Sequence, residues 1–251
     1  MDYITGNKFK KKCHHSYDEH GYIIHSEPID NEILRIFVKT DYIHYFFNRK
    51  IETPYILFTH NSDLPIDDSY LQYLDNEKLV KWYGQNIMTK HSKLFSIPIG
   101  IANEIWEHGN EKVFNEVIEK KLQKERLIYV NFDTKTNPPE RNYCLNEIRN
   151  NGLDMSNKLP FKKYLEELSK SYFVVSPNGN GVDCHKTWES LYVRTIPIVT
   201  KSINISFYYD YPMIVIDDWS KFDLNNFNVE LYNKTWESFN SNQLNINNFI
   251  N

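Results

Sequence analysis

The sequence predicts an α/β protein of two Rossmann-like lobes with a cleft between them. Short runs rich in aromatic and β-branched residues recur along the chain as strand candidates. In the second half these runs alternate with segments of helical spacing, which is typical of parallel βαβ units. Two of only eight glycines, Gly179 and Gly181, fall in the polar loop of SPNGNGVDCHKTWESLYVRTIPIV (176–199), between an apolar run and a helix. Open α/β sheets bind ligands at such strand-to-helix turns.

The first half contains four strand candidates followed by one helix. The strands are Ile33 to Val38, Tyr55 to Thr59, Leu79 to Tyr83 and Leu94 to Ile101. The helix has an apolar stripe at helical spacing, made by Val113, Phe114, Val117, Ile118 and Leu122. We expect the lobes to divide near the charged stretch 107–111, so that residues 1–107 form the N-terminal lobe.

The second half alternates regularly. The expected strands are Leu127 to Phe132, Tyr172 to Val175, residues 196–200 and Met213 to Ile216. A helix should begin at Pro138-Pro139, where a missing N–H costs nothing, and end before Gly152. A second helix carries Phe161, Tyr164, Leu165 and Leu168 as an apolar stripe. Residues 108–222 would form the C-terminal lobe, and residues 223–251 a tail that could be helical and pack back on the N-terminal lobe.

Composition narrows the functional classes. The formal net charge of −4 argues against nucleic-acid binding, which needs clustered Lys and Arg. Three scattered cysteines fit reduced thiols in the cytoplasm better than disulfides. The N-terminus lacks the apolar segment of a secretory signal, and no apolar run approaches the roughly 20 residues that span a bilayer. We therefore expect a cytoplasmic protein without a membrane span.

A metal site is not expected. Cys13, His14 and His15, with His20 and His25, have no zinc-finger spacing. They follow the basic run 8–12 in what reads as a loose, solvated N-terminus. The chain also lacks any Asp-x-Asp motif.

The helix after the glycine loop is expected to begin near Asp183, whose carboxylate would cap it. Cys184, Trp188 and Leu191 share one side of this helix and should face the core.

His185, Lys186 and Glu189 share the opposite side. Cations in a first turn do not favour the helix itself, because its N-terminus is already positive. Such cations favour a bound anion instead. We therefore predict a diphosphate site from the combination of glycines, a helix N-terminus and a lysine. Glu189 would accept hydrogen bonds from the ribose hydroxyls. The alternative is an ordinary NGNG turn beside an exposed Lys186/Glu189 ion pair.

The 176–199 segment resembles the donor-site segment of exostosin-like glycosyltransferases, which have the two-lobed GT-B fold. Other similar segments follow in the same order: YILFTHNSDLP (55–65), WYGQN (82–86), SIPIGIAN (96–103), VNFDTKTNPPER (130–141) and VIDDW (215–219). The resemblance covers roughly residues 54 to 220. In two respects the chain departs from the family: Lys186 stands where an arginine is usual, and the membrane anchor of the eukaryotic members is missing.

The resemblance implies an inverting, metal-independent glycosyltransferase without a cofactor. The C-terminal lobe would bind a nucleotide sugar, with a UDP-pentose such as UDP-xylose or a UDP-hexose favoured, and the N-terminal lobe a glycan or glycoprotein acceptor. Lys186 and Arg141 would neutralise the departing diphosphate together with backbone N–H groups of 179–183. A surface arginine is the alternative for Arg141. The other expected donor-binding residues are Asn131, Thr136, Asn137, Ser176, Asn178, Gly179, Asn180, Gly181, Asp183, His185 and Glu189.

An inverting transferase needs one general base for the acceptor hydroxyl. We expect Asp63 to be this base, with His60 as the alternative or as its orienting partner; both follow a strand. An ordinary Asn-Ser-Asp turn would explain the same residues. Two other functions compete with this one. The first is a fucosyltransferase-like enzyme that uses a GDP-sugar, and the second is a catalytically inactive module that binds a sugar nucleotide or a glycan.

Overall fold

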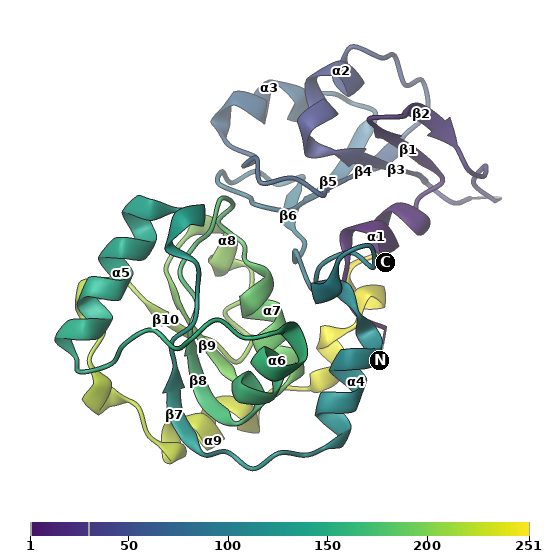
Figure 1. Cartoon of the computed structure of the whole chain (residues 1–251). Helices are drawn as coiled ribbons and strands as arrows, with labels where there is room; N and C mark the ends of the chain where they lie inside the picture. Colours follow the sequence, from purple (N-terminus) through teal and green to yellow (C-terminus); the bar gives the residue numbers. More distant parts are fainter. Residues whose placement is uncertain (1, 30, 251) are drawn as a thin grey trace. The chain divides into compact units, whose positions relative to one another are not determined.

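The computed structural model describes residues 2–29 and 31–250, and it is an α/β protein. Its contacts divide the chain into two compact units, which are described separately. The first unit comprises the residues up to Ile99 together with the segment from Asn245, and the second comprises Gly100–Leu244. Figure 1 labels the helices and strands of both.

The first unit contains a mixed sheet of six strands in the order β2-β1-β3-β4-β5-β6. The strands are β1 (His15–Asp18), β2 (Gly21–Ile24), β3 (Leu34–Lys39), β4 (Tyr55–His60), β5 (Leu79–Gly84) and β6 (Leu94–Ser96). The β1–β2 pair is antiparallel and every other pair is parallel. The helices of this unit are α1 (Gly6–Lys11), α2 (Ile43–Phe47) and α3 (Leu71–Leu74).

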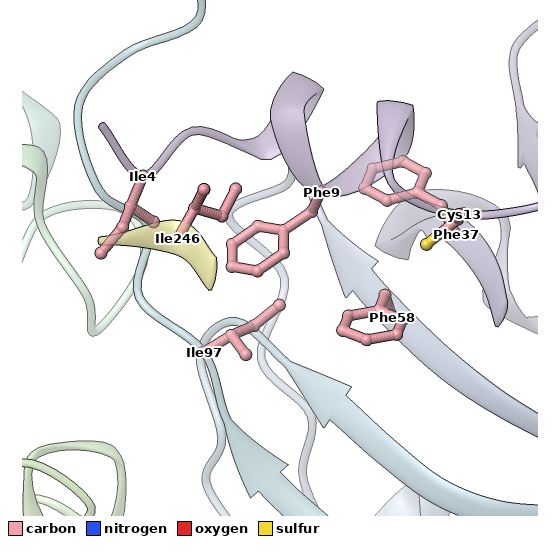
Figure 2. Close-up of a cluster of buried hydrophobic side chains, with 7 residues drawn as sticks. All are labelled: Ile4, Phe9, Cys13, Phe37, Phe58, Ile97 and Ile246. Atoms are coloured by element: carbon pink, nitrogen blue, oxygen red, sulfur yellow. The ribbon is translucent and has the colours of Figure 1, made fainter. Parts of the chain in front are cut away.

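The N-terminal segment is ordered, and the expectation of a loose, solvated terminus is wrong. Phe9 from α1 and Cys13 are buried in a cluster with Phe37 and Phe58 of the sheet. Figure 2 shows Ile246, from the C-terminal segment, beside Ile4 and Phe9 in the same cluster. Burial of these apolar side chains stabilises the segment, while the lysines of the basic run form ion pairs such as Lys8–Asp2 at 2.8 Å.

The second unit contains a parallel sheet of four strands in the order β10-β9-β8-β7. The strands are β7 (Arg126–Tyr129), β8 (Ser171–Val175), β9 (Ile196–Thr200) and β10 (Ile214–Ile216). The helices are α4 (Glu111–Glu119), α5 (Pro138–Asn150), α6 (Phe161–Ser169), α7 (His185–Tyr192), α8 (Ile203–Ser206) and α9 (Val229–Glu237). Helices α6 and α7 contact each other beside the sheet, α6 against β8 and α7 against β9 (Figure 1).

One predicted strand is shorter in the structure, and two strands of the first unit were not predicted. The strand expected from Leu94 to Ile101 ends at Ser96, because Pro98 has no N–H for a ladder hydrogen bond. Strands β1 and β2 were not predicted, since His15–Asp18 lacks an apolar alternation. The remaining strand candidates all form strands, with ends shifted by at most three residues.

The three cysteines are free thiols, two of them buried. Among the residues that the structure describes, no helix combines the length and apolarity needed to cross a bilayer.

Candidate functional site

A pocket of about 740 Å³ lies in the second unit. Its walls come from the turn after β7, from the start of α7, from α5 and α6, and from the segment between α5 and α6. The lining residues that bear on function are Asn131, Asp133, Thr136, Arg141, Arg149, Met155, Lys158, Leu159, Tyr164, His185, Lys186 and Glu189. Because β7 and β8 are parallel, the turns after them meet at the carboxyl edge of the sheet, where α/β folds bind ligands.

Helix α7 presents two different sides, as its spacing predicted. Trp188 and Leu191 are buried in the core. His185, Lys186 and Glu189 line the pocket. The first two turns of the helix therefore bring two nitrogen-bearing side chains and one carboxylate to one cavity.

The Tyr164 hydroxyl joins Lys186 to Glu189. Lys186 Nζ donates a hydrogen bond to Tyr164 Oη at 3.0 Å, and Tyr164 Oη donates to Glu189 Oε2 at 2.8 Å. Lys186 Nζ also lies 4.4 Å from the centre of the Tyr164 ring. Glu189 is only 4% exposed. The alternative of an exposed Lys186/Glu189 ion pair is therefore wrong, because the carboxylate is buried and bonded to a tyrosine.

Lys186 is the charged group best suited to bind an anion in this pocket. Its pKa is lowered to about 8, chiefly by burial; the charge of Glu189 opposes this shift, and the charge of Arg141 contributes to it. Tyr164 is the one hydrogen-bond acceptor found for Nζ among the described residues. An ammonium group has three N–H donors, so two remain for a ligand.

His185 is held in one orientation. Its Nδ1 lies 2.8 Å from the carbonyl oxygen of Gly100, so Nδ1 carries the proton and donates. Nε2 is then the ring nitrogen that remains for a ligand, and a ligand hydroxyl can bond to it.

Arg141 holds the glycine loop from α5. Its Nε donates to Asn178 O at 2.9 Å and its Nη1 to Asp133 O at 2.7 Å. Asn137 Nδ2 donates to Gly179 O at 2.8 Å. A Cβ atom at Gly179 would lie 3.1 Å from Arg141 Nη2, so glycine lets the arginine come close. Arg141 is thus more than a surface arginine, because it joins two turns at the edge of the pocket.

The glycine loop itself does not line the described pocket. Of the predicted donor-binding residues, the lining includes Asn131, Thr136, Arg141, His185, Lys186 and Glu189. It does not include Asn137, Ser176, Asn178, Gly179, Asn180, Gly181 and Asp183. The Gly179 N–H is used inside the loop, 3.1 Å from both Gly181 O and Cys184 Sγ. Ser176 Oγ is buried against Thr187 Oγ1 at 2.9 Å. These two groups shape the loop instead of facing the pocket.

Asp183 is not the N-cap of α7, and that expectation is wrong. The cap position is Cys184, whose side chain makes no capping hydrogen bond. The Asp183 carboxylate is buried and accepts the indole N–H of Trp188 at 2.7 Å. Burial of Trp188 draws the carboxylate inward, and the helix begins one residue later than a cap at Asp183 would allow.

We expect Arg141→Lys to lower the free energy of unfolding by about 1–2 kcal/mol, because lysine keeps the charge but lacks the planar, forked guanidinium whose Nε and Nη1 donate to Asn178 O and Asp133 O. Urea unfolding measures the change. Arg149→Lys on the same helix is the control: Arg149 pairs at 3.0 Å with the exposed Asp154, and such a pair contributes about 0–1 kcal/mol. An Arg141→Lys variant as stable as the wild type would show that the loop does not depend on this arginine.

His60 and Asp63 lie in the first unit, at the end of β4 and in the following turn. His60 is buried, its Nδ1 accepts the Asn61 N–H at 2.7 Å, and its Nε2 lies 3.1 Å from Pro98 O. Both ring nitrogens are therefore engaged within the protein. Asp63 is exposed.

Several lining residues were not predicted as functional. Tyr164 was counted only as part of an apolar stripe, and His108, Arg149, Met155, Lys158 and Leu159 were not considered. For Tyr164 a signal existed: a tyrosine among aliphatic residues on a buried stripe carries a hydroxyl that needs a partner. The segment 155–159 has no comparable pattern.

Among the described residues, no group of three or more His, Cys, Asp and Glu side chains is arranged to hold a metal ion. Comparison of the chain with protein-family models and with curated proteins yields no match.

Proposed function

We propose that the chain is a glycosyltransferase that binds a nucleoside-diphosphate sugar in the pocket of the second unit, with a UDP-sugar as the favoured donor. The observation that carries this proposal is the placement of Lys186 and Glu189 on the same side of α7, where both line the pocket. Lys186 offers two N–H groups to a diphosphate, and Glu189 Oε1 offers an acceptor to ribose hydroxyls.

The charge of the pocket supports an anionic ligand. Its lining includes four basic side chains, Arg141, Arg149, Lys158 and Lys186, against the two carboxylates of Asp133 and Glu189. This excess is local, since the chain as a whole carries a formal charge of −4. A concave site with excess positive charge concentrates anions.

The proposed reaction is a direct displacement at the anomeric carbon. The acceptor oxygen forms a bond to that carbon as the bond to the diphosphate oxygen breaks, and the base Asp63 takes the hydroxyl proton. The diphosphate gains negative charge as it departs, and the fixed charge of Lys186 stabilises it in that state. This proposal treats the two units as the two lobes of a GT-B fold, with the acceptor in the first.

Thermal denaturation with UDP, GDP and ADP, each at about 1 mM, tests the donor site. A ligand that binds only the folded protein raises the melting temperature, by an amount that grows with the ratio of its concentration to its Kd. We expect the largest rise with UDP. No rise with any of the three would overturn the proposal, and a rise with GDP alone would support a GDP-sugar donor.

Hydrolysis and transfer assays with a panel of UDP-sugars then test turnover. Nucleotide binding without release of UDP, unchanged by Asp63→Asn, would indicate a binding module. Release that Asp63→Asn abolishes would support Asp63 as the base.

A further inference from the structure

Tyr164 is held in place from three sides. Its ring lies on α6, stacked at 6.3 Å from the Phe161 ring and tilted at 6.3 Å from the Tyr129 ring. Its third neighbour is Lys186, above the ring. The side chain is 7% exposed. The hydroxyl position is therefore set by packing, independently of any ligand.

This hydroxyl lies between two charges that would otherwise meet. Lys186 and Glu189 are three residues apart on α7, a spacing at which lysine and glutamate side chains pair directly. Within the part of the chain that the structure describes, they form no ion pair within 4.0 Å; each bonds to Tyr164 instead.

We propose that Tyr164 is a positioning residue that keeps Lys186 and Glu189 apart, so that both remain available to a nucleoside diphosphate. A direct ion pair would engage the ammonium with the carboxylate and leave less positive charge for the phosphate oxygens. With the tyrosine between them, Lys186 keeps two donors for the phosphates and Glu189 keeps Oε1 for the ribose. This inference rests on the proposed function.

Tyr164→Phe tests it by removing one oxygen. In the ligand-free variant Lys186 and Glu189 should pair directly, which favours the charged lysine. The groups that act on Lys186 are Glu189, Arg141 and Cys184, and the substitution leaves all three in place. The rate of Lys186 acetylation by acetic anhydride, followed by mass spectrometry across pH, reports its titration. We expect the midpoint to rise by about one pH unit and UDP affinity to fall about tenfold.

Two further variants separate positioning from packing. Tyr129→Phe is the matched control: its hydroxyl is buried without a hydrogen-bond partner among the described residues, and its ring also contacts Tyr164. It should change neither the midpoint nor the affinity. In Tyr164→Phe/Glu189→Gln the carboxylate charge is gone, so the midpoint should fall below that of Tyr164→Phe.

The outcomes distinguish this inference from the proposed function. A lysine midpoint that does not rise in Tyr164→Phe overturns the positioning role, even if UDP binds the wild type. A midpoint that rises as expected, in a protein that binds no nucleoside diphosphate, confirms that Tyr164 separates the two charges but overturns their role toward that ligand.

Discussion

Replacement of Lys186 by alanine is expected to weaken UDP binding by about 10- to 100-fold, the cost of losing hydrogen bonds from a charged donor to a phosphate. The effect should be large because Lys186 is half-buried: it lines the pocket at the first turn of α7 and is screened less than a surface lysine. Isothermal titration calorimetry of wild type and variant measures the change.

Lys162→Ala is the control for this experiment. Lys162 lies on α6 and pairs with Glu116 at 2.5 Å, and it does not line the pocket. It should leave UDP affinity unchanged, since it removes the same charge at a distance from the proposed phosphates. A Lys186→Ala variant that binds UDP as tightly as the wild type would show that the diphosphate does not lie at α7.

Periodicity predicts the helices α4 and α6 of the second unit because each has an apolar stripe that is buried. In α6, Phe161, Leu165 and Leu168 recur at helical spacing and are all buried in the structure. The N-terminal segment could not be predicted in this way. Its order depends on Phe9 and Cys13 packing against Phe37 and Phe58, contacts that join residues about 24 to 49 positions apart in the chain.

The candidate site was only partly predictable for a similar reason. The helical wheel correctly places Lys186 and Glu189 on one side of α7, since that depends on local spacing alone. It gives no information about Tyr164, which comes from another helix and decides whether those two side chains meet. The conformation of the glycine loop likewise depends on Arg141, which lies on α5 and bonds to Asn178, 37 residues further along the chain.

The affinity for UDP is expected to depend on pH through Lys186. Its pKa of about 8 in the ligand-free protein is lowered by burial, and a bound diphosphate favours the charged form. Well below pH 8 the ammonium is already present, so affinity is full there. As pH rises through 8, binding must take up a proton, and affinity should fall by about tenfold at pH 9. Calorimetry at intervals from pH 7 to pH 9 measures the slope.

Lys186→Arg isolates this effect, because arginine stays protonated throughout the range. Two other groups of the pocket region do not titrate in this range: burial raises the pKa of Cys184 to about 11 and raises the pKa of Tyr164, so both stay neutral. The uracil ring of the ligand is the same in both measurements, so its titration cancels in the ratio of wild-type to Lys186→Arg affinity. That ratio should level off well below pH 8 and fall about tenfold by pH 9. A ratio that stays constant to pH 9 would mean that the lysine ammonium does not bind the diphosphate. The anion would then have to lie beside other basic residues on the pocket wall, such as Arg149 and Lys158.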